Sequence, residues 1–289
     1  MVVEMDSYGA TGTGSSGQIV SMIVFILIIF LVLFTAETVY NATVDASQRF
    51  VTLMDYTANA ESMPLVIHQD AAMYKEAKVL GLSMNERTGI EFAYSFFMYV
   101  NPSTFTGDAV LKHVFHKGYG CPWPLMGPGV FLHGHENTMR VFMNTYKNPY
   151  THCDIKNIPV QKWFHVVLNC YKKGLDIYIN GKLANRISFK GTLPYQNFQD
   201  IVMFSSANYN NLRAQAVVGP NAPATENPFQ VQGAFKGQFS KFIYTRYALS
   251  ATEIDGLMRA GPAPKMKEKT TDQPPYFADD WWRETSVSP

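Results

Sequence analysis

The residues of this chain that could bind a metal ion are its histidines. The sequence has seven of them, and four come in two close pairs, His113 with His116 and His133 with His135. Only His133 and His135 have the two-residue spacing that puts both side chains on one face of a strand, and Glu136 adjoins them. A zinc site usually takes three or four converging ligands. We therefore predict ordinary surface or core histidines, with no metal ion and no cofactor.

The acidic residues and the overall charge restrict the classes of ligand. Asp108, Asp154 and Asp200 stand at expected loop positions and could offer carboxylates to calcium. No dense acidic loop accompanies them, which argues against a strong calcium site. Calcium binding through these three carboxylates stays an alternative. The net charge is +1 and no long basic run stands out, which argues against nucleic acid as a partner. The three cysteines are an odd number without short spacings, which argues against a disulfide scaffold.

Contacts with a glycan or a protein would come from aromatic and amide side chains. Tyr195 and Asn197 offer that composition, as does the long Asn/Pro/Ala-rich segment 208–233. The alternative is that such residues simply make good turns. Aromatic residues near the C-terminus would be costly to leave exposed, so we expect them to pack on this domain or on a neighbour. The candidate contacts are Tyr209, Asn210, Asn211, Tyr276, Trp281 and Trp282.

The elements that position these residues are organised around 158–189. Alternating apolar residues predict three consecutive antiparallel strands, 164–171, 175–179 and 182–189. Asn180-Gly181 is the favoured pair for a type I′ hairpin turn, because both central residues need φ > 0. One face of the sheet is apolar, so a second layer must cover it. We predict an all-β, two-sheet antiparallel sandwich.

The same segment resembles a known family. Trp163-Phe164-His165-Val166, followed by the run 175–183 that contains Tyr178, Asn180 and Gly181, is similar to the core of laminin-G-like jelly rolls in the concanavalin A-like lectin/glucanase superfamily. The segments 237–242 and 247–254 resemble that family's last strand and short terminal helix. The resemblance implies a jelly-roll sandwich over 62–261. Its core motif here is Trp163, His165, Tyr178, Asn180 and Gly181.

Because that superfamily includes glucanases, the carboxylates of this sequence must be compared with the motifs of glycoside hydrolases. The related retaining glycosidases place carboxylates on one strand face, about 5 Å apart, with motifs of the type E-x-D-x-x-E. The only superficial match is Glu253-Ile254-Asp255, which lacks the third carboxylate. Ser250 and Glu253 instead form a capping box for a short terminal helix. We predict no enzymatic activity.

An uncharged apolar run precedes the sandwich. Residues 19–36 and their flanks are long enough to span a bilayer. The N-terminal tail is acidic and the first base is Arg49, so the positive-inside tendency puts the sandwich on the cytosolic side. The glycosylation sequon Asn41-Ala42-Thr43 lies next to the membrane. The anchor residues are Ile19, Val24, Phe25, Ile28, Phe30, Leu33 and Phe34.

The expected organisation has five parts. They are a flexible tail (1–18), a transmembrane helix (19–40), a stalk (41–61), a laminin-G-like sandwich (62–261) and an extended C-terminal tail (262–289).

A narrower resemblance concerns the source of the chain. The motifs in 85–96, 113–118, 127–132, 157–163 and 274–276 are similar to membrane-anchored virion proteins of large icosahedral DNA viruses of algae and protists. That resemblance implies a minor capsid protein in which the bilayer and major capsid or other shell proteins are the partners. The alternative is a surface lectin or adhesin that binds glycans with the opposite topology.

Overall fold

The structure is a computed structural model. It describes residues 14–61, 64–81, 83, 90–119, 125–148, 151–206, 208–210 and 230–266, with only the backbone at 14–16, 44–48, 119 and 208–210. The chain divides into two units, Met1–Arg49 and Phe50–Pro289.

The first unit contains one long helix, α1 (Gly14–Arg49), of 36 residues. At 1.5 Å per residue it is about 54 Å long. The helix continues nine residues beyond the end expected for the anchor, so the prediction of a stalk from residue 41 is wrong here. Residues 41–49 contain neither proline nor glycine, and nothing in the sequence stops the helix before Arg49.

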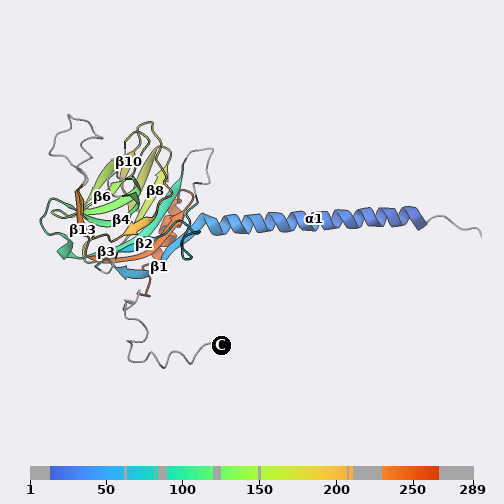
Figure 1. Cartoon of the computed structure of the whole chain (residues 1–289), viewed down its shortest axis with the longest axis horizontal. Coiled ribbons are helices and arrows are strands. Elements are labelled where there is room, and N and C mark those ends of the chain that lie inside the picture. Colours follow the sequence, from blue (N-terminus) through green and yellow to red (C-terminus); the bar gives the residue numbers. More distant parts are fainter. Residues whose placement is uncertain are drawn as a thin grey trace, which may run out of the picture. The chain divides into compact units, whose positions relative to one another are not determined.

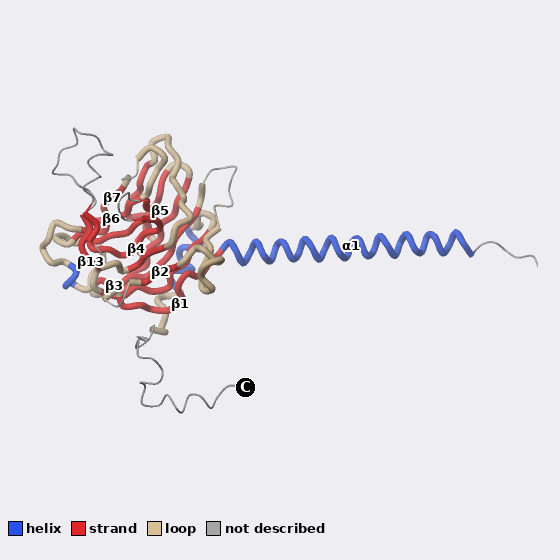
Figure 2. The backbone as a smooth tube through the Cα atoms, viewed as in Figure 1, coloured by secondary structure: helices blue, strands red, loops and turns tan. Residues whose placement is uncertain are grey.

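The second unit is a sandwich of two sheets, drawn in Figures 1 and 2. The order in the six-stranded sheet is β1 (Phe50–Asn59), β14 (Gly237–Thr245), β3 (Phe92–Val100), β8 (Trp163–Tyr171), β9 (Gly174–Ile179) and β10 (Lys182–Ser188). The order along the other sheet is β12 (Asn208–Asn210), β13 (Gln230–Ala234), β4 (Leu111–Tyr119), β5 (Leu125–His133), β6 (Thr138–Phe142) and β7 (His152–Lys156). Two short strands, β11 (Ile201–Met203) and β2 (Leu65–Ile67), extend this sheet from β4. Two helical elements lie within this unit, the single turn η1 (Pro102–Thr104) and the short α-helix α3 (Ala251–Arg259).

The predicted fold class is confirmed. Both sheets are antiparallel apart from one parallel pairing between β13 and β4, and an apolar N-terminal helix and a short C-terminal helix accompany them. The core between the sheets is aromatic. Phe96, Phe115 and Phe242 contact one another, with ring centroids 4.8–5.9 Å apart.

The predicted meander is also confirmed, as strands β8, β9 and β10. Asn180 and Gly181 have φ values of 47° and 74°, as the hairpin turn requires. The outer face of β8 is buried as well, since both His165 and Asn169 are inaccessible. Asn169 bonds to both the N–H and the carbonyl of Leu249, 2.8 Å each, so the segment that leads into α3 covers this face.

The predicted start of the sandwich at residue 62 is too late. Strand β1 is hydrogen-bonded to β14, with Met54 opposite Phe242, and Leu53 and Met54 are buried. The register shifts on both sides of Met54. These shifts break the apolar alternation that would have marked a strand in the sequence.

Two other expected segments differ from the structure. The Asn/Pro/Ala-rich segment 208–233 is not wholly composed of turns, because its ends belong to the strands β12 and β13, which pair with each other. The tail from residue 262 begins by packing on β1, because Ala263 is buried and the Thr57 hydroxyl donates to its carbonyl at 2.8 Å. Residues 211–229 and 267–289 lie outside the described part of the chain.

Candidate functional site

The apolar surface of α1 is the first candidate site. The helix contains a candidate membrane span of 27 residues, Gly17–Thr43, whose most apolar 18-residue window has a mean hydropathy of 3.2, and none of that window is buried. The predicted anchor residues Ile19, Val24, Phe25, Ile28, Phe30, Leu33 and Phe34 are all exposed, by between 47% and 71%. They lie on every side of the helix. The helix is therefore long and apolar enough to cross a membrane, by length and composition, and a signal sequence would have the same properties.

The five residues of the family motif lie together around the β8–β9–β10 meander. His165 is buried, whereas Trp163 and Tyr178 are half-buried. Trp163 packs against Tyr99, with ring centroids 5.8 Å apart, and Tyr178 packs against the cluster formed by α3 and β8. Asn180 and Gly181 form the turn. In the structure all five residues support the meander.

His165 also makes a contact that the sequence did not reveal. Its Nε2 lies 2.7 Å from the hydroxyl oxygen of Ser95, the geometry of a nucleophile and its base. Both side chains are at most 2% exposed, and His165 Nδ1 has no partner among the described residues. Burial lowers the pKa of His165 to about 4. Ser95 lines a cavity of about 200 Å³, but His165 Nδ1 bonds to no carboxylate among the described residues, so the contact acts as a buried hydrogen bond between β3 and β8.

The predicted partner and glycan contacts are only in small part described. The backbones of Tyr209 and Asn210 belong to β12, and nothing is described of their side chains. Asn211, Tyr276, Trp281 and Trp282 lie outside the described residues.

The Tyr195 and Asn197 region behaves as a structural turn. Asn197 is buried, its amide donates to the carbonyl of Lys117 at 2.9 Å, and its side-chain oxygen accepts from the Gln199 N–H at 3.1 Å. The ring of Tyr195 packs edge-on against that of Tyr146. The turn alternative considered from the sequence therefore fits Asn197, whose side chain is occupied within the protein.

The sequence did not indicate a groove that lies over β8, β9 and β10. It has a volume of about 650 Å³ and its walls include Tyr171, Tyr178 and Lys172. Asp176, buried in the groove floor, pairs with the guanidinium of Arg186 through two hydrogen bonds. Tyrosine rings beside a fixed charge pair can bind a polar ligand through stacking and hydrogen bonds. Apart from Glu91, the groove residues come from 171–188, and they converge only when β8, β9 and β10 pair in register.

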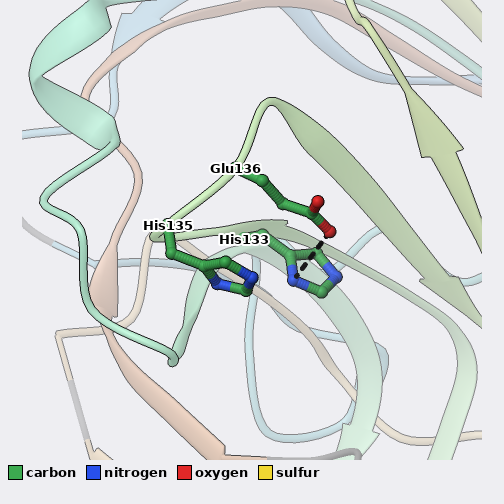
Figure 3. A group of neighbouring side chains, drawn as sticks. All are labelled: His133, His135 and Glu136. Atoms are coloured by element: carbon green, nitrogen blue, oxygen red, sulfur yellow. Dashed lines mark ion pairs between the residues drawn. The ribbon is translucent and has the colours of Figure 1, made fainter.

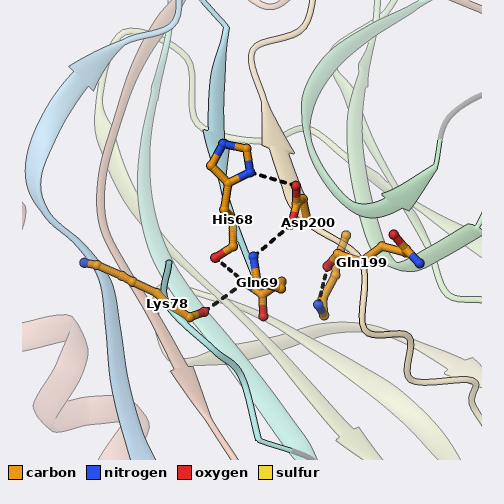
Figure 4. Close-up of polar contacts among 6 residues, drawn as sticks. His68, Gln69, Lys78, Gln199 and Asp200 are labelled. Atoms are coloured by element: carbon orange, nitrogen blue, oxygen red, sulfur yellow. Dashed lines mark hydrogen bonds and ion pairs between the residues drawn. The ribbon is translucent and has the colours of Figure 1, made fainter. Parts of the chain in front are cut away.

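A polar network joins β2, β4 and β11 and includes one of the predicted calcium ligands (Figure 4). Asp200 accepts from the backbone N–H of Gln69 at 2.8 Å and lies 2.9 Å from Nδ1 of His68. Lys117, 1% exposed, donates to the carbonyl of Gln199 at 2.6 Å. Desolvation lowers the pKa of Lys117 to about 8, although Asp200 opposes this. The carboxylate of Asp200 is thus occupied in holding strands together.

The two predicted histidine pairs differ in environment. His113 and His116 are buried, and Nε2 of His113 lies 2.6 Å from Nδ1 of His116. At the end of β5, His133 joins His135 and Glu136 from the following turn (Figure 3). One ligand atom from each of these three lies within 4.8 Å of the others. Among the described residues, this β5–β6 cluster is the group whose geometry could hold a metal ion.

Residues on the neighbouring strands support the β5–β6 cluster. His133 Nε2 lies 3.7 Å from the carboxylate of Asp154 on β7, and Nδ1 lies 3.8 Å from that of Glu136. Arg140 on β6 binds both oxygens of Asp154 at 2.7 Å. Although partial burial opposes it, these hydrogen bonds hold the pKa of Asp154 well below its ordinary value. Asp154, proposed from the sequence as a calcium ligand, instead forms this ion pair.

The carboxylates considered for glycoside hydrolysis have structural roles. The predicted capping box is confirmed, since Ser250 and Glu253 exchange side-chain and backbone hydrogen bonds. Glu253 also accepts from the Tyr247 hydroxyl at 2.7 Å. Asp255 forms an ion pair with Arg259, one turn further along the helix, at 2.9 Å. These two carboxylates do not form a glycosidase pair on a strand.

Comparison with known proteins shows limited likeness. No family model and no curated protein sequence matches the chain. Solved structures with a similar fold include the receptor-binding domain of botulinum neurotoxin D, at 11% identity and a TM-score of 0.47, covering 73% of this chain and 44% of that one. The binding domain of botulinum neurotoxin DC is similar in its complexes with SialylT (14%, 0.45, covering 71% and 42%) and with rat synaptotagmin II (15%, 0.43, covering 73% and 46%). The chain spans less than half the length of these structures.

Proposed function

We propose that this chain is a non-catalytic, single-pass membrane protein whose β-sandwich binds a partner at the membrane surface. The observation that carries the proposal is the apolar surface of α1, which is exposed on all sides of the helix. Burial in lipid stabilises such a surface by roughly 25 cal/mol for each Å² removed from water. No residue separates α1 from β1, so the sandwich begins directly after the helix in the chain.

The specific role that we propose is that of a minor capsid protein linking an internal virion membrane to the capsid shell. The sequence resemblance to membrane-anchored virion proteins supports this role. The sandwich would then face the shell on the cytosolic side, as the position of Arg49 after the apolar run favours. Major capsid or other shell proteins would be its partners.

Extraction and protease protection test the anchor and its orientation. The full-length protein should stay with the membrane at alkaline pH, which releases peripheral proteins. Protease added from the cytosolic side should digest the sandwich in intact vesicles. N-terminal sequencing should find α1 in the mature protein. A mature chain that starts after α1, or release into the alkaline supernatant, would refute a membrane-spanning helix.

A second candidate function, a membrane-anchored lectin, is favoured by the groove beside Tyr171 and Tyr178. That function requires the opposite topology, with glycosylation at Asn41 and a protease-protected sandwich. Binding of the full-length protein to a glycan array, lost on Tyr178→Ala, would favour the lectin. An array with no bound glycan would leave the linker role as the better account.

A further inference from the structure

One ring nitrogen of a buried histidine in the sandwich has no hydrogen-bond partner in the described part of the chain. The side chain of His133 is 9% exposed, and its Nε2 has no hydrogen-bond partner among the described residues. The nearest carboxylate oxygen, on Asp154, is 3.7 Å away. Buried polar atoms in proteins are nearly always paired, so this atom calls for an explanation.

The Nδ1 side of the same ring faces two further groups that can bind a metal ion, the imidazole of His135 and the carboxylate of Glu136. Figure 3 shows the rings of His133 and His135 side by side, with the Glu136 carboxylate next to them. The ring centroids are 5.3 Å apart, and the Glu136 oxygen lies 3.8 Å from His133 Nδ1. Three potential ligand atoms therefore converge on one small volume at the end of β5.

We propose that His133, His135 and Glu136 bind a divalent transition-metal ion, for which Zn²⁺ is the best fit. Two imidazoles and one carboxylate form a donor set that zinc uses in sites with an open fourth position. Calcium and magnesium take oxygen ligands, so this set selects against them. Neither the anchor nor the capsid role is needed for this inference.

The geometry needs only a small closure around the ion. Ligand atoms on a tetrahedral zinc ion lie about 3.4 Å apart, given bonds of about 2.1 Å. Those of the β5–β6 cluster already lie within 4.8 Å of one another. His135 is exposed and Glu136 is partly exposed, both in a turn, so their side chains can rotate towards the ion. His133 is fixed by strand β5 and would set the position of the ion.

Asp154 would complete the site as the partner of His133. A histidine that binds a metal usually gives its other ring N–H to a carboxylate, which fixes the ring and its tautomer. Asp154 lies on the Nε2 side of His133, and its two 2.7 Å bonds to Arg140 hold the carboxylate in place. This arrangement would give the unpaired Nε2 a role, with Nδ1 as the ligand atom.

A bound ion would join the end of β5 to the turn before β6. Three protein ligands leave one coordination position. Because His135 is exposed, the ion would lie at the protein surface, where this position can take water or a side chain of another protein. The site would therefore let another protein bind the sandwich through a metal ion at the turn between β5 and β6.

Metal titration of the full-length protein tests this proposal. The protein is purified in detergent without a histidine tag, stripped with a chelator and titrated with Co²⁺, whose visible absorption reports tetrahedral coordination. Competition with Zn²⁺ then gives the zinc affinity. We expect one equivalent of metal, and at least a 10-fold weaker affinity in His135→Ala and in Glu136→Gln. Both residues lie in a turn, so the near-ultraviolet circular dichroism of the variants should match the wild type.

The control is His152→Ala, which removes an exposed histidine on the neighbouring strand β7 and should leave the affinity unchanged. Wild-type protein without saturable metal binding would overturn the proposal. Binding that survives both His135→Ala and Glu136→Gln would also overturn it, because an ion held elsewhere, for example by His113 and His116, does not need them.

Discussion

Asn180 and His165 are joined by two hydrogen bonds across the start of the β8–β9 pair. The side-chain oxygen of Asn180 accepts from the His165 N–H at 2.9 Å, and the Asn180 N–H donates to the His165 carbonyl at 2.9 Å. Asn180 also has φ = 47°, a left-handed conformation that asparagine and glycine tolerate best. One side chain thus fixes both the turn and the register of the two strands.

Substitutions at Asn180 should separate these two contributions. Asn180→Ala loses the side-chain bond and strains the backbone, so we expect a loss of about 2 kcal/mol in the free energy of unfolding. Asn180→Gly loses only the bond and should lose about 1 kcal/mol. Thermal unfolding of the full-length protein in detergent, followed by tryptophan fluorescence, measures both. Equal losses in the two variants would show that the backbone conformation contributes nothing.

The buried histidines should make the sandwich sensitive to acid. Burial lowers the pKa values of His116 and His165 to about 4, and that of His113 lies well below 6.5. Histidine in an unfolded chain has a pKa of about 6.5, so between pH 6.5 and 4 the unfolded state binds more protons. Stability therefore falls as the pH falls through this window.

A variant at His165 tests that pH dependence. His165→Asn should be less stable at pH 7, because the bond to Ser95 is lost, yet its stability should decrease less between pH 6.5 and 4.5. Urea unfolding at several pH values gives the two slopes. His152→Asn, at an exposed histidine, should keep the wild-type slope. An unchanged slope in His165→Asn would mean that His165 becomes protonated in the folded state.

The buried Lys117 should add a pH dependence of the same sign at alkaline pH. Desolvation lowers its pKa to about 8, whereas lysine in an unfolded chain titrates near 10.4. Between these values the unfolded state binds more protons, so the contribution of Lys117 to stability improves as the pH rises. The difference in unfolding free energy between Lys117→Met and wild type should shift by about 2 kcal/mol in favour of the wild type from pH 7.5 to 9.5. A constant difference would contradict the lowered pKa.

The apolar helix gives a direct prediction about membrane insertion. Ile28 lies near the middle of the apolar run and is exposed. Ile28→Arg puts a charge at the bilayer centre, at a cost of about 3 kcal/mol, and should reduce the membrane-inserted fraction. Ile28→Leu is the matched control and should insert normally. Quantitative alkaline extraction measures both, and full insertion of the arginine variant would argue against a span centred on Ile28.

Local patterns predicted the parts of the fold that local interactions determine. The β8–β10 meander follows from alternation and from Asn180-Gly181, and the start of α3 from Ser250 and Glu253. Strand β1 was missed because its register shifts disrupt the alternation around Met54. The burial of Asn169 was missed because it depends on Leu249, 80 residues away.

The candidate sites were harder to predict for the same reason. The pairing of Asp176 with Arg186 in the groove depends on the alignment of β9 with β10. The spacing of His133 and His135 was visible in the sequence. Their relation to Asp154 was not, because it requires β6 and β7 to bring that residue back beside β5. The spacing in the sequence therefore indicated the pair His133 and His135, but not the residue of β7 that lies beside them.

Cross-linking mass spectrometry on intact particles or membranes that contain this protein tests the central claim most directly. Lysine- and carboxyl-reactive reagents would report neighbours of the segments 208–233 and 263–289 and of the exposed Lys172 and Lys173 beside the groove. In intact particles the account predicts cross-links from these positions to a major shell protein, with the shell shielding the sandwich from added protease. Intact particles in which the cross-links stay within the chain, and in which protease and added glycans reach the sandwich, would contradict the account and favour the lectin.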